Sequence, residues 1–353
     1  MVTSDLLENP EQLTAEWLTR RLQQNGYLAD GEVLSILSKP LQKQHRSLLV
    51  TYSSQVEEPL PRKFILKWYP STYPHGVNEG WFYRQVASAM PISPAPACYD
   101  VVIDDASWQT HILLADLSDT YFMPTFPFNQ LSEQQVLSIV DAYCQFHAFW
   151  WDHPRIFQDN FLKARGSEVT HAATSISVIQ ESQCYFADKA LPRWMDQYKA
   201  YIQPEWQTIC EKSITAWADL FSQRIANKKT LTLIQGDAHL NNVLLPRQQG
   251  RRSILIDWEG WIRGVGVWDL ARMLLISQFP VAKRRSLEQK LLSHYHTRLT
   301  ELCVDNYRLQ NCHDDYRLCV LANIPHVLAY GDPPYMESAM QAFRDWHCEE
   351  LLA

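Results

Sequence analysis

Three residues in one part of the chain, Asp237, Asn242 and Asp257, have side chains suited to phosphate chemistry. The first two lie in LTLIQGDAHLNNVLL, where apolar runs flank a short polar core, and Asp257 follows in SILIDWE. Phosphoryl transfer from a nucleotide needs a carboxylate that orients the attacking hydroxyl and accepts its proton, together with oxygen ligands that hold Mg²⁺. A polar turn of this kind is, taken alone, more often an Asx-turn. The combination with Asp257 is what points to a phosphotransferase site.

Such a site also needs a lysine for the nucleotide phosphates and a carboxylate that holds this lysine. Lys67 lies in the strand-like run RKFILKWY, and Glu79 lies at the start of the helix-like segment GVNEGWFYRQVASAM. Alone, Lys67 fits a solvent-facing strand position, and Glu79 fits a helix N-terminus, where the dipole favours negative charge. Their order ahead of Asp237 gives both residues a possible function.

The order of these motifs resembles the aminoglycoside phosphotransferase and choline kinase superfamily, which has a protein-kinase-like fold and a catalytic loop of the form H-G-D-x-H-x-x-N. The corresponding segment here is QGDAHLNN, residues 235–242. Downstream, IDWEGWIRGVGVWDLARML is similar to the family's metal-binding segment. Upstream, NEGWFYRQV, HILLADLSD and YCQFHAFWW are most similar to the branch that includes the insect ecdysteroid kinase-like proteins. The resemblance spans residues 15–275, and the C-terminal remainder is similar only in general shape.

The resemblance implies a role for each matching residue. Asp237 would be the catalytic base, and Asn242 and Asp257 would be the Mg²⁺ ligands. Lys67 would hold the phosphates of ATP, with Glu79 as its ion-pair partner. The chain is therefore expected to be an ATP- and Mg²⁺-dependent kinase that phosphorylates a hydroxyl group of a small molecule.

The resemblance also implies that the adenine binds at a hinge from Ala115 to Leu117, mainly through backbone groups. Ala115 replaces an acidic residue that is common in the family, which matters little where the backbone makes the contact. Gln235 replaces the first histidine of the catalytic loop. Because glutamine can still form hydrogen bonds, we expect activity to survive this replacement.

The expected phosphate loop, PLQKQHRSLL, contains no glycine. A backbone cradle of the usual glycine-rich kind therefore cannot be assumed. Side chains are the alternative source of phosphate contacts. The candidates are Ser47 and the basic residues Lys43, His45 and Arg46.

Further polar and aromatic residues lie close to the proposed catalytic segments. His239 is expected either to brace the catalytic loop or to contact a ligand. Glu259 has tryptophans on both sides, and with Trp258 and Trp261 it could hold a cationic or sugar-like substrate, although packing of the two indoles is the simpler explanation. Asp269 is expected to cap its helix or to tether the catalytic loop.

Apolar periodicity predicts a small β-rich lobe followed by a larger helical lobe, an α+β organisation with expected lobes at residues 1–117 and 118–353. The elements predicted in the first lobe are helices at 10–25 and 76–90 and strands at 32–38, 47–53, 62–69, 99–103 and 109–115, the first three strands forming an antiparallel meander. In the second lobe, a capping box at Ser132 and Gln135 predicts one helix. The other elements predicted there are helices at 193–226, 267–277, 285–301, 313–330 and 333–352, with strand pairs at 231–245 and 253–258.

Composition narrows the class of partner. The 353 residues include 32 basic and 39 acidic side chains, which gives a formal charge of −7. A negative net charge does not favour binding to nucleic acid or to an anionic membrane. No window approaches the roughly 18 apolar residues of a membrane span, and no secretory signal is evident at the N-terminus. The eight cysteines form no C-x-x-C pair, so we expect reduced thiols in the cytoplasm.

Several alternatives to this assignment remain. The acceptor could be an aminoglycoside or related antibiotic, a choline-like alcohol, a sugar, or a natural-product alcohol. The glycine-free loop and Gln235 also fit a weak or inactive kinase-like protein that only binds nucleotide. A metal-dependent hydrolase using Asp237 and His239 is a weaker alternative, because no second histidine lies at ligand spacing.

Overall fold

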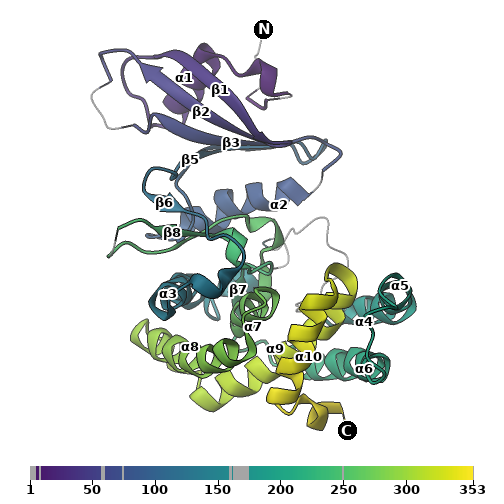
Figure 1. Cartoon of the computed structure of the whole chain (residues 1–353). Coiled ribbons are helices and arrows are strands. Elements are labelled where there is room, and N and C mark those ends of the chain that lie inside the picture. The colour runs from purple at the N-terminus through teal and green to yellow at the C-terminus, as the bar shows by residue number, and fades with distance from the viewer. Residues whose placement is uncertain are drawn as a thin grey trace. The chain divides into compact units, whose positions relative to one another are not determined.

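The computed structural model describes residues 5–7, 9–56, 60–73, 75–158, 161, 175–248 and 250–352. The chain forms two compact units (Figure 1). The first comprises residues up to 122 together with 246–249 and 255–260, and the second comprises 123–245, 250–254 and 261 onward. The segment around Asp257 therefore belongs to the first unit, although it follows the catalytic-loop segment in sequence. The lobe boundary expected at residue 117 stays a prediction.

The first unit contains a five-stranded sheet in which all neighbouring strands are antiparallel. Its order is β1-β2-β3-β5-β4. The three-strand meander and the two later strands predicted from the sequence are thus confirmed. The strands are β1 Val33–Gln42, β2 His45–Tyr52, β3 Lys63–Tyr69, β4 Cys98–Ile103 and β5 Thr110–Ala115.

Helix α1, Ala15–Gln24, covers one face of this sheet, and helix α2, His75–Trp81, lies on the other (Figure 1). The side chain of Thr14 caps α1 by accepting a hydrogen bond from the Trp17 amide. Alternate residues of β3 point to opposite faces of the sheet, so Leu66 packs in the core under α1 while Lys67 faces α2. This alternation positions the lysine of the candidate site.

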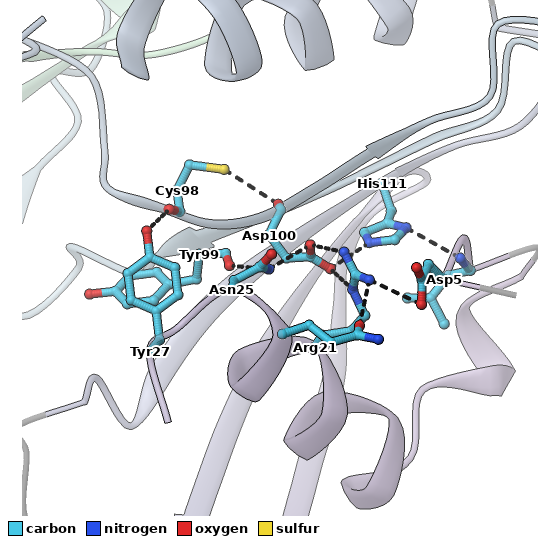
Figure 2. Close-up of polar contacts among 10 residues, drawn as sticks. Asp5, Arg21, Asn25, Tyr27, Cys98, Tyr99, Asp100 and His111 are labelled. Carbon is cyan, nitrogen blue, oxygen red and sulfur yellow. Dashed lines mark hydrogen bonds and ion pairs between the residues drawn. The ribbon is translucent and has the colours of Figure 1, made fainter. Parts of the chain in front are cut away.

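A buried polar network fastens α1 to the sheet (Figure 2). The Arg21 guanidinium donates to both carboxylate oxygens of Asp100 on β4, at 2.8 and 2.6 Å. His111 Nδ1 accepts a hydrogen bond from the Leu7 amide, so its Nε2 carries the proton and donates to Asp100, 2.9 Å away. Burial opposes ionisation of Asp100, but the hydrogen bonds from Arg21 and His111 outweigh burial and lower its pKa to about 2.

The helix predicted at 76–90 contains three kinds of turn. Helix α2 continues as a π-helical turn, Phe82–Val86, and ends in a 3₁₀ turn, Ala87–Ala89. Its first residues pack tightly on the sheet, because a Cβ added at Gly76 would lie 2.1 Å from the Tyr69 ring. Glycine at this position lets the helix approach β3 closely, which helps to bring Glu79 near Lys67.

The second unit is mainly helical. Helix α3 starts with the predicted capping box, in which the Ser132 hydroxyl and the Gln135 side chain each bond the other's backbone amide. The helices are α3 Glu133–Trp150, α4 Ile176–Tyr185, α5 Leu191–Gln197, α6 Trp206–Ile225, α7 Val267–Ile276, α8 Val281–Glu301, α9 Leu309–Tyr330 and α10 Pro333–Asp345. Helix α7 packs against both α9 and α10. No described helix is both long enough and apolar enough to cross a membrane.

Some of the predicted boundaries are wrong. The helix expected at 193–226 is interrupted between α5 and α6, where Pro204 lacks an amide proton and disfavours helical geometry at the preceding residue. The helix expected to reach 352 ends at Asp345, close to His347 in the left-handed region with φ of 50°.

The short strands also differ from the prediction. Strand β7, Thr232–Ile234, pairs with β10, Ile262–Gly264, which was not predicted. Further short strands are β6 Tyr121–Phe122, β8 Val243–Pro246 and β9 Ile254–Leu255. The antiparallel sheet and the helical second unit together confirm the predicted α+β class.

Candidate functional site

A buried ion pair forms the centre of the site in the first unit. The Lys67 ammonium on β3 donates to both carboxylate oxygens of Glu79 on α2, at 2.7 and 2.8 Å. Asp257 Oδ1 lies 3.4 Å from the same ammonium. Burial would lower the pKa of Lys67, but the carboxylates of Glu79 and Asp257 outweigh burial and raise it. The lysine is therefore held as a cation between two carboxylates.

Two tyrosines that were not identified from the sequence donate hydrogen bonds to Glu79 and to a further carboxylate, Glu259. The Tyr69 hydroxyl donates to Glu79 at 2.6 Å, and the Tyr73 hydroxyl donates to Glu259 at 2.8 Å. Their rings are stacked, with centroids 5.6 Å apart. Strand alternation could have identified Tyr69, because it lies two residues after Lys67 and so on the same face. Tyr73 lies beyond the strand and had no comparable signal.

The segment after β9 brings two carboxylates close to Glu79. Asp257 has a φ of 62°, a left-handed conformation that aspartate tolerates better than most residues. Carboxylate oxygens of Asp257, Glu79 and Glu259 lie within 4.8 Å of one another, so the donor set consists of the hard oxygens that Mg²⁺ prefers. Burial and the nearby charge of Asp257 raise the pKa of Glu259 to about 7.

The residue between these two carboxylates is part of the packing. Trp258 is fully buried and stacks on Phe82, with ring centroids 4.0 Å apart, and its backbone amide points to Glu79 at 3.4 Å. Trp261 is only 2% exposed and lies edge-on to Phe161 in the second unit. Burial of both indoles favours the packing explanation over a substrate cage.

The sheet face that carries Lys67 also presents apolar side chains. Leu37 and Leu49 are directly opposite each other on β1 and β2, and they are 53% and 46% exposed. Ser47 lies on the same face, opposite Ile65 of β3. Leu49 pairs with Lys63, four residues before Lys67 on β3, so this part of the face has the apolar character that suits a planar base.

The predicted hinge follows β5. The Ala115 amide donates to the Ala97 carbonyl, the Asp116 amide to the Lys63 carbonyl, and the Ser118 amide to the Asp116 side chain. Within the described part of the chain, the Leu117 amide makes no hydrogen bond. Leu117 thus offers one backbone donor at the hinge, whereas the Ala115 donor is already used.

In the second unit, the Asp237 carboxylate contacts the side chains of Arg272 and His239. Arg272 of α7 donates to its Oδ1 at 2.8 Å, and His239 Nε2 lies 3.4 Å from its Oδ2. Partial burial opposes ionisation of Asp237, but the His239 hydrogen bond and the Arg272 charge outweigh it and hold its pKa well below the usual range. The carboxylate is thus kept ionised, and its side chain remains 48% exposed.

Arg272 connects this carboxylate to the C-terminal helices. It is buried in α7 and also donates to the Tyr335 hydroxyl of α10 at 2.7 Å. The Tyr335 hydroxyl in turn donates to Asn323 of α9. Neither Arg272 nor Asn323 was singled out in the sequence, and Tyr335 was not linked to Asp237, because these contacts join residues far apart in the chain.

Asp269, at the start of α7, holds the backbone of the catalytic loop. Its carboxylate accepts hydrogen bonds from the amides of Gln235 at 2.7 Å and Gly236 at 3.0 Å, and His147 Nε2 lies 3.2 Å away. The neighbouring Trp268 indole donates to the Gly236 carbonyl at 2.9 Å. Of the two functions predicted for Asp269, loop tethering is therefore the one observed.

The side chains of Gln235 and Asn242 are also fixed. The Tyr143 hydroxyl donates to Gln235 Oε1 at 2.6 Å, so the glutamine is anchored to α3. Asn242 Nδ2 donates to the Asp237 carbonyl at 3.0 Å. This assignment leaves Oδ1 of Asn242 as the side-chain atom that could accept a hydrogen bond or bind a cation.

The structure thus brings the proposed site residues together in two groups. Lys67, Glu79, Asp257 and Glu259 form one group in the first unit, and Asp237, His239 and Asn242 form the other in the second unit. Ser47 and the hinge lie on the sheet of the first unit, whereas Trp261 packs in the core of the second.

Two solved structures are similar to this chain in fold. An ethanolamine kinase from Plasmodium vivax has a TM-score of 0.52 at 11% identity, with 88% of this chain and 81% of that chain covered. An aminoglycoside phosphotransferase from Alicyclobacillus acidocaldarius has a TM-score of 0.50 at 12% identity, with 90% and 91% covered. At these identities the structures establish the kinase-like two-lobe α+β fold alone. No curated protein sequence matches the chain.

The family assignment comes from the sequence model of the ecdysteroid kinase-like family, which matches residues 81–307. The matched region is more than half of the chain and contains Asp237, Asn242 and Asp257. The chain belongs to the ecdysteroid kinase-like family.

Proposed function

We propose that this protein transfers the γ-phosphoryl group of ATP to a hydroxyl group of a small molecule. The observation that carries the proposal is the buried Lys67–Glu79 ion pair with Asp257 at the same ammonium. A lysine held in this way can pair with the α- and β-phosphates. Family membership and the ionised Asp237 support the same reaction class.

Nucleotide binding is assigned to the first unit. The exposed face near Leu37 and Leu49 would receive the adenine, and the Leu117 amide would donate a hydrogen bond to it. Ala115 would contribute its carbonyl oxygen, because its amide already donates to Ala97. Ser47 would lie along the bound nucleotide, on the face that carries Lys67.

Asn242 and Asp257 are proposed as the ligands of Mg²⁺. The oxygen character of both side chains fits this ion, as does the neighbouring carboxylate of Glu259. When bound, Mg²⁺ would neutralise phosphate charge and polarise the phosphoryl oxygens. Lys67 and Glu79 would remain paired beside the phosphates.

Asp237 is assigned to the acceptor. Its carboxylate would accept a hydrogen bond from the acceptor hydroxyl and so orient the oxygen towards the γ-phosphorus. As the new oxygen–phosphorus bond forms and the bond to the bridging oxygen of ADP breaks, the hydroxyl proton would pass to Asp237 and then to solvent. A carboxylate with a lowered pKa is a weak base, so orientation is its main contribution and the proton moves late.

Gln235 is compatible with an active enzyme. Its side chain is anchored by Tyr143, and its amide is held by Asp269, so the loop retains supports that a histidine would provide.

We propose the cytoplasm as the site of action, which the eight free cysteines support.

Measurement of ADP release tests the reaction. Purified protein with ATP and Mg²⁺ should release ADP faster with at least one member of a panel of aminoglycosides, choline-like alcohols, sugars and polycyclic alcohols than with water alone. Nucleotide binding without acceptor-dependent release by any of them would favour the alternative of a nucleotide-binding protein without kinase activity.

Metal dependence gives a second test. ATP at about 100 times its Kd should stabilise the fold by about 2.7 kcal/mol. Most of this stabilisation should disappear in EDTA, because Asn242 and Asp257 would hold the nucleotide only when Mg²⁺ is bound. Asp257→Ala should remove the Mg²⁺-dependent part of the thermal shift. An equal ATP-induced shift with Mg²⁺ and with EDTA would contradict the metal assignment.

A further inference from the structure

The tip of the β1–β2 hairpin lacks the backbone features of a glycine-rich phosphate loop. A two-residue turn, Lys43 and Gln44, joins the strands, and Gln42 pairs directly with His45. Glycine-rich loops hold phosphates with backbone amides, which requires conformations that glycine adopts readily. With so short a turn and no glycine, phosphate contacts at this position must come from side chains.

His45 is the side chain at the tip that faces the lysine of the site. It lies directly opposite Lys67 in the β2–β3 register, and directly opposed residues of antiparallel strands project from the same face. Its ring is edge-on to Tyr69, with centroids 6.3 Å apart and planes at 87°. Tyr69 itself donates to Glu79, so His45 belongs to the same group of side chains as the ion pair.

The other candidates at the tip are less well placed. Arg46 projects from the opposite face, where its Nε donates to the Ser38 hydroxyl at 2.7 Å. Lys43 is exposed in the turn. Ser47 shares the face of His45 but lies opposite Ile65, two residues further from Lys67 along β3. Only His45, among the side chains proposed for this loop, lies opposite the phosphate-binding lysine.

The imidazole is also available to bind. Within the described residues, its ring nitrogens make no hydrogen bond, and the side chain is only partly buried. Burial, followed by the nearby charge of Lys67, lowers the pKa of His45 to about 4. A neutral imidazole can donate one N–H while adding no positive charge next to the ammonium.

We propose that His45 donates a hydrogen bond from its ring to a phosphate oxygen of the nucleotide bound by Lys67, in place of the backbone amides of a glycine-rich loop. The proposal rests on the proposed function, because it presumes that Lys67 binds nucleotide phosphates. It makes His45 a nucleotide-binding residue with specificity for the phosphate part of the ligand.

The test compares ligands with and without phosphates. Binding of ADP and of adenosine should be measured by displacement of a fluorescent ADP analogue from the wild type and from His45→Ala. Loss of a hydrogen bond to a charged group should weaken ADP binding by about 10-fold or more and leave adenosine binding unchanged. His45→Gln or His45→Asn, each of which retains an N–H donor, should restore much of the ADP affinity.

Arg46→Ala is the matched control, because it removes a neighbouring basic side chain that projects from the other face. It should bind both ligands as the wild type does. Equal ADP affinity in the wild type and His45→Ala, an equal loss for ADP and adenosine, or failure of both conservative variants to restore ADP binding would each overturn the proposal. If the wild type itself bound no ADP, the proposed function would fail as well, which separates the two outcomes.

Discussion

Replacing Asp237 with asparagine is expected to lower turnover by about 10²- to 10⁴-fold, equivalent to roughly 3 to 5 kcal/mol of activation free energy. Asparagine keeps the size of the side chain and one acceptor oxygen, but it removes the negative charge that is proposed to orient the hydroxyl and the ability to take the hydroxyl proton. Nucleotide affinity should change little, because the proposed phosphate and metal contacts are made by Lys67, Asn242 and Asp257.

The alternative is that Asp237 only stabilises the turn after Gly236. In that case Asp237→Asn should cost roughly 1 kcal/mol of stability and keep its turnover. The structure provides a reason to expect otherwise, since the amides of Gln235 and Gly236 are already held by Asp269. The side chain of Asp237 instead contacts Arg272 and His239.

A single preparation of Asp237→Asn distinguishes the two explanations when ADP affinity, melting temperature and acceptor-dependent ADP release are measured together. Ser132→Ala is a suitable control, because Ser132 is a demonstrated helix cap in the capping box of α3. It should lower the melting temperature without lowering turnover. Unchanged turnover of Asp237→Asn at saturating substrate would end the mechanism proposed for this residue.

Local sequence patterns were sufficient to predict the framework of the first unit. Strand-like runs bounded by turn segments identified β1 to β5, and the geometry of a strand puts Lys67 on the face opposite to the core residue Leu66. The chemistry of the site was also visible locally, because Asp237 and Asn242 share one loop. These features depend on residues that are close in sequence.

Contacts between distant segments could not be read in the same way. Arg272 looked like an ordinary residue of an amphipathic helix, yet it is buried against Asp237, 35 positions earlier in the chain. Tyr73 bonds Glu259 across 186 positions. Neither pairing has a signature in spacing, since tertiary packing decides which polar groups meet in the interior.

The errors in the helical unit have a similar origin. Periodicity continued across Pro204, but the backbone requirements of proline broke the helix there. Strand β7 was expected to pair within residues 231–245, whereas its partner is β10, from beyond Asp257. Short strands carry too little pattern to determine their partners.

Removing either member of the Lys67–Glu79 pair is the second change with a large expected effect. Lys67→Ala leaves the Glu79 carboxylate buried without its main counter-charge. Glu79→Ala likewise leaves the Lys67 ammonium buried without its main counter-charge. Breaking a buried pair in this way typically costs about 3 to 5 kcal/mol of stability. Each variant should also lose turnover, because the lysine that is proposed to bind the phosphates is missing or displaced.

The double variant Lys67→Ala/Glu79→Ala should lose much less than the sum of the two single losses, both in stability and in turnover, because the second substitution removes the charge that the first left unpaired. Melting temperature and ADP release on the wild type, the two single variants and the double variant measure this coupling.

Lys63 and Asp119 supply a matched control. They form an ion pair of the same 2.7 Å length, with its lysine also on β3, but their side chains are 42% and 70% exposed. Their double-mutant cycle should give a much smaller coupling, because solvent screens a pair whose side chains are this exposed. Strict additivity in the Lys67–Glu79 cycle would show that the two residues act independently and would remove Glu79 from the proposed site.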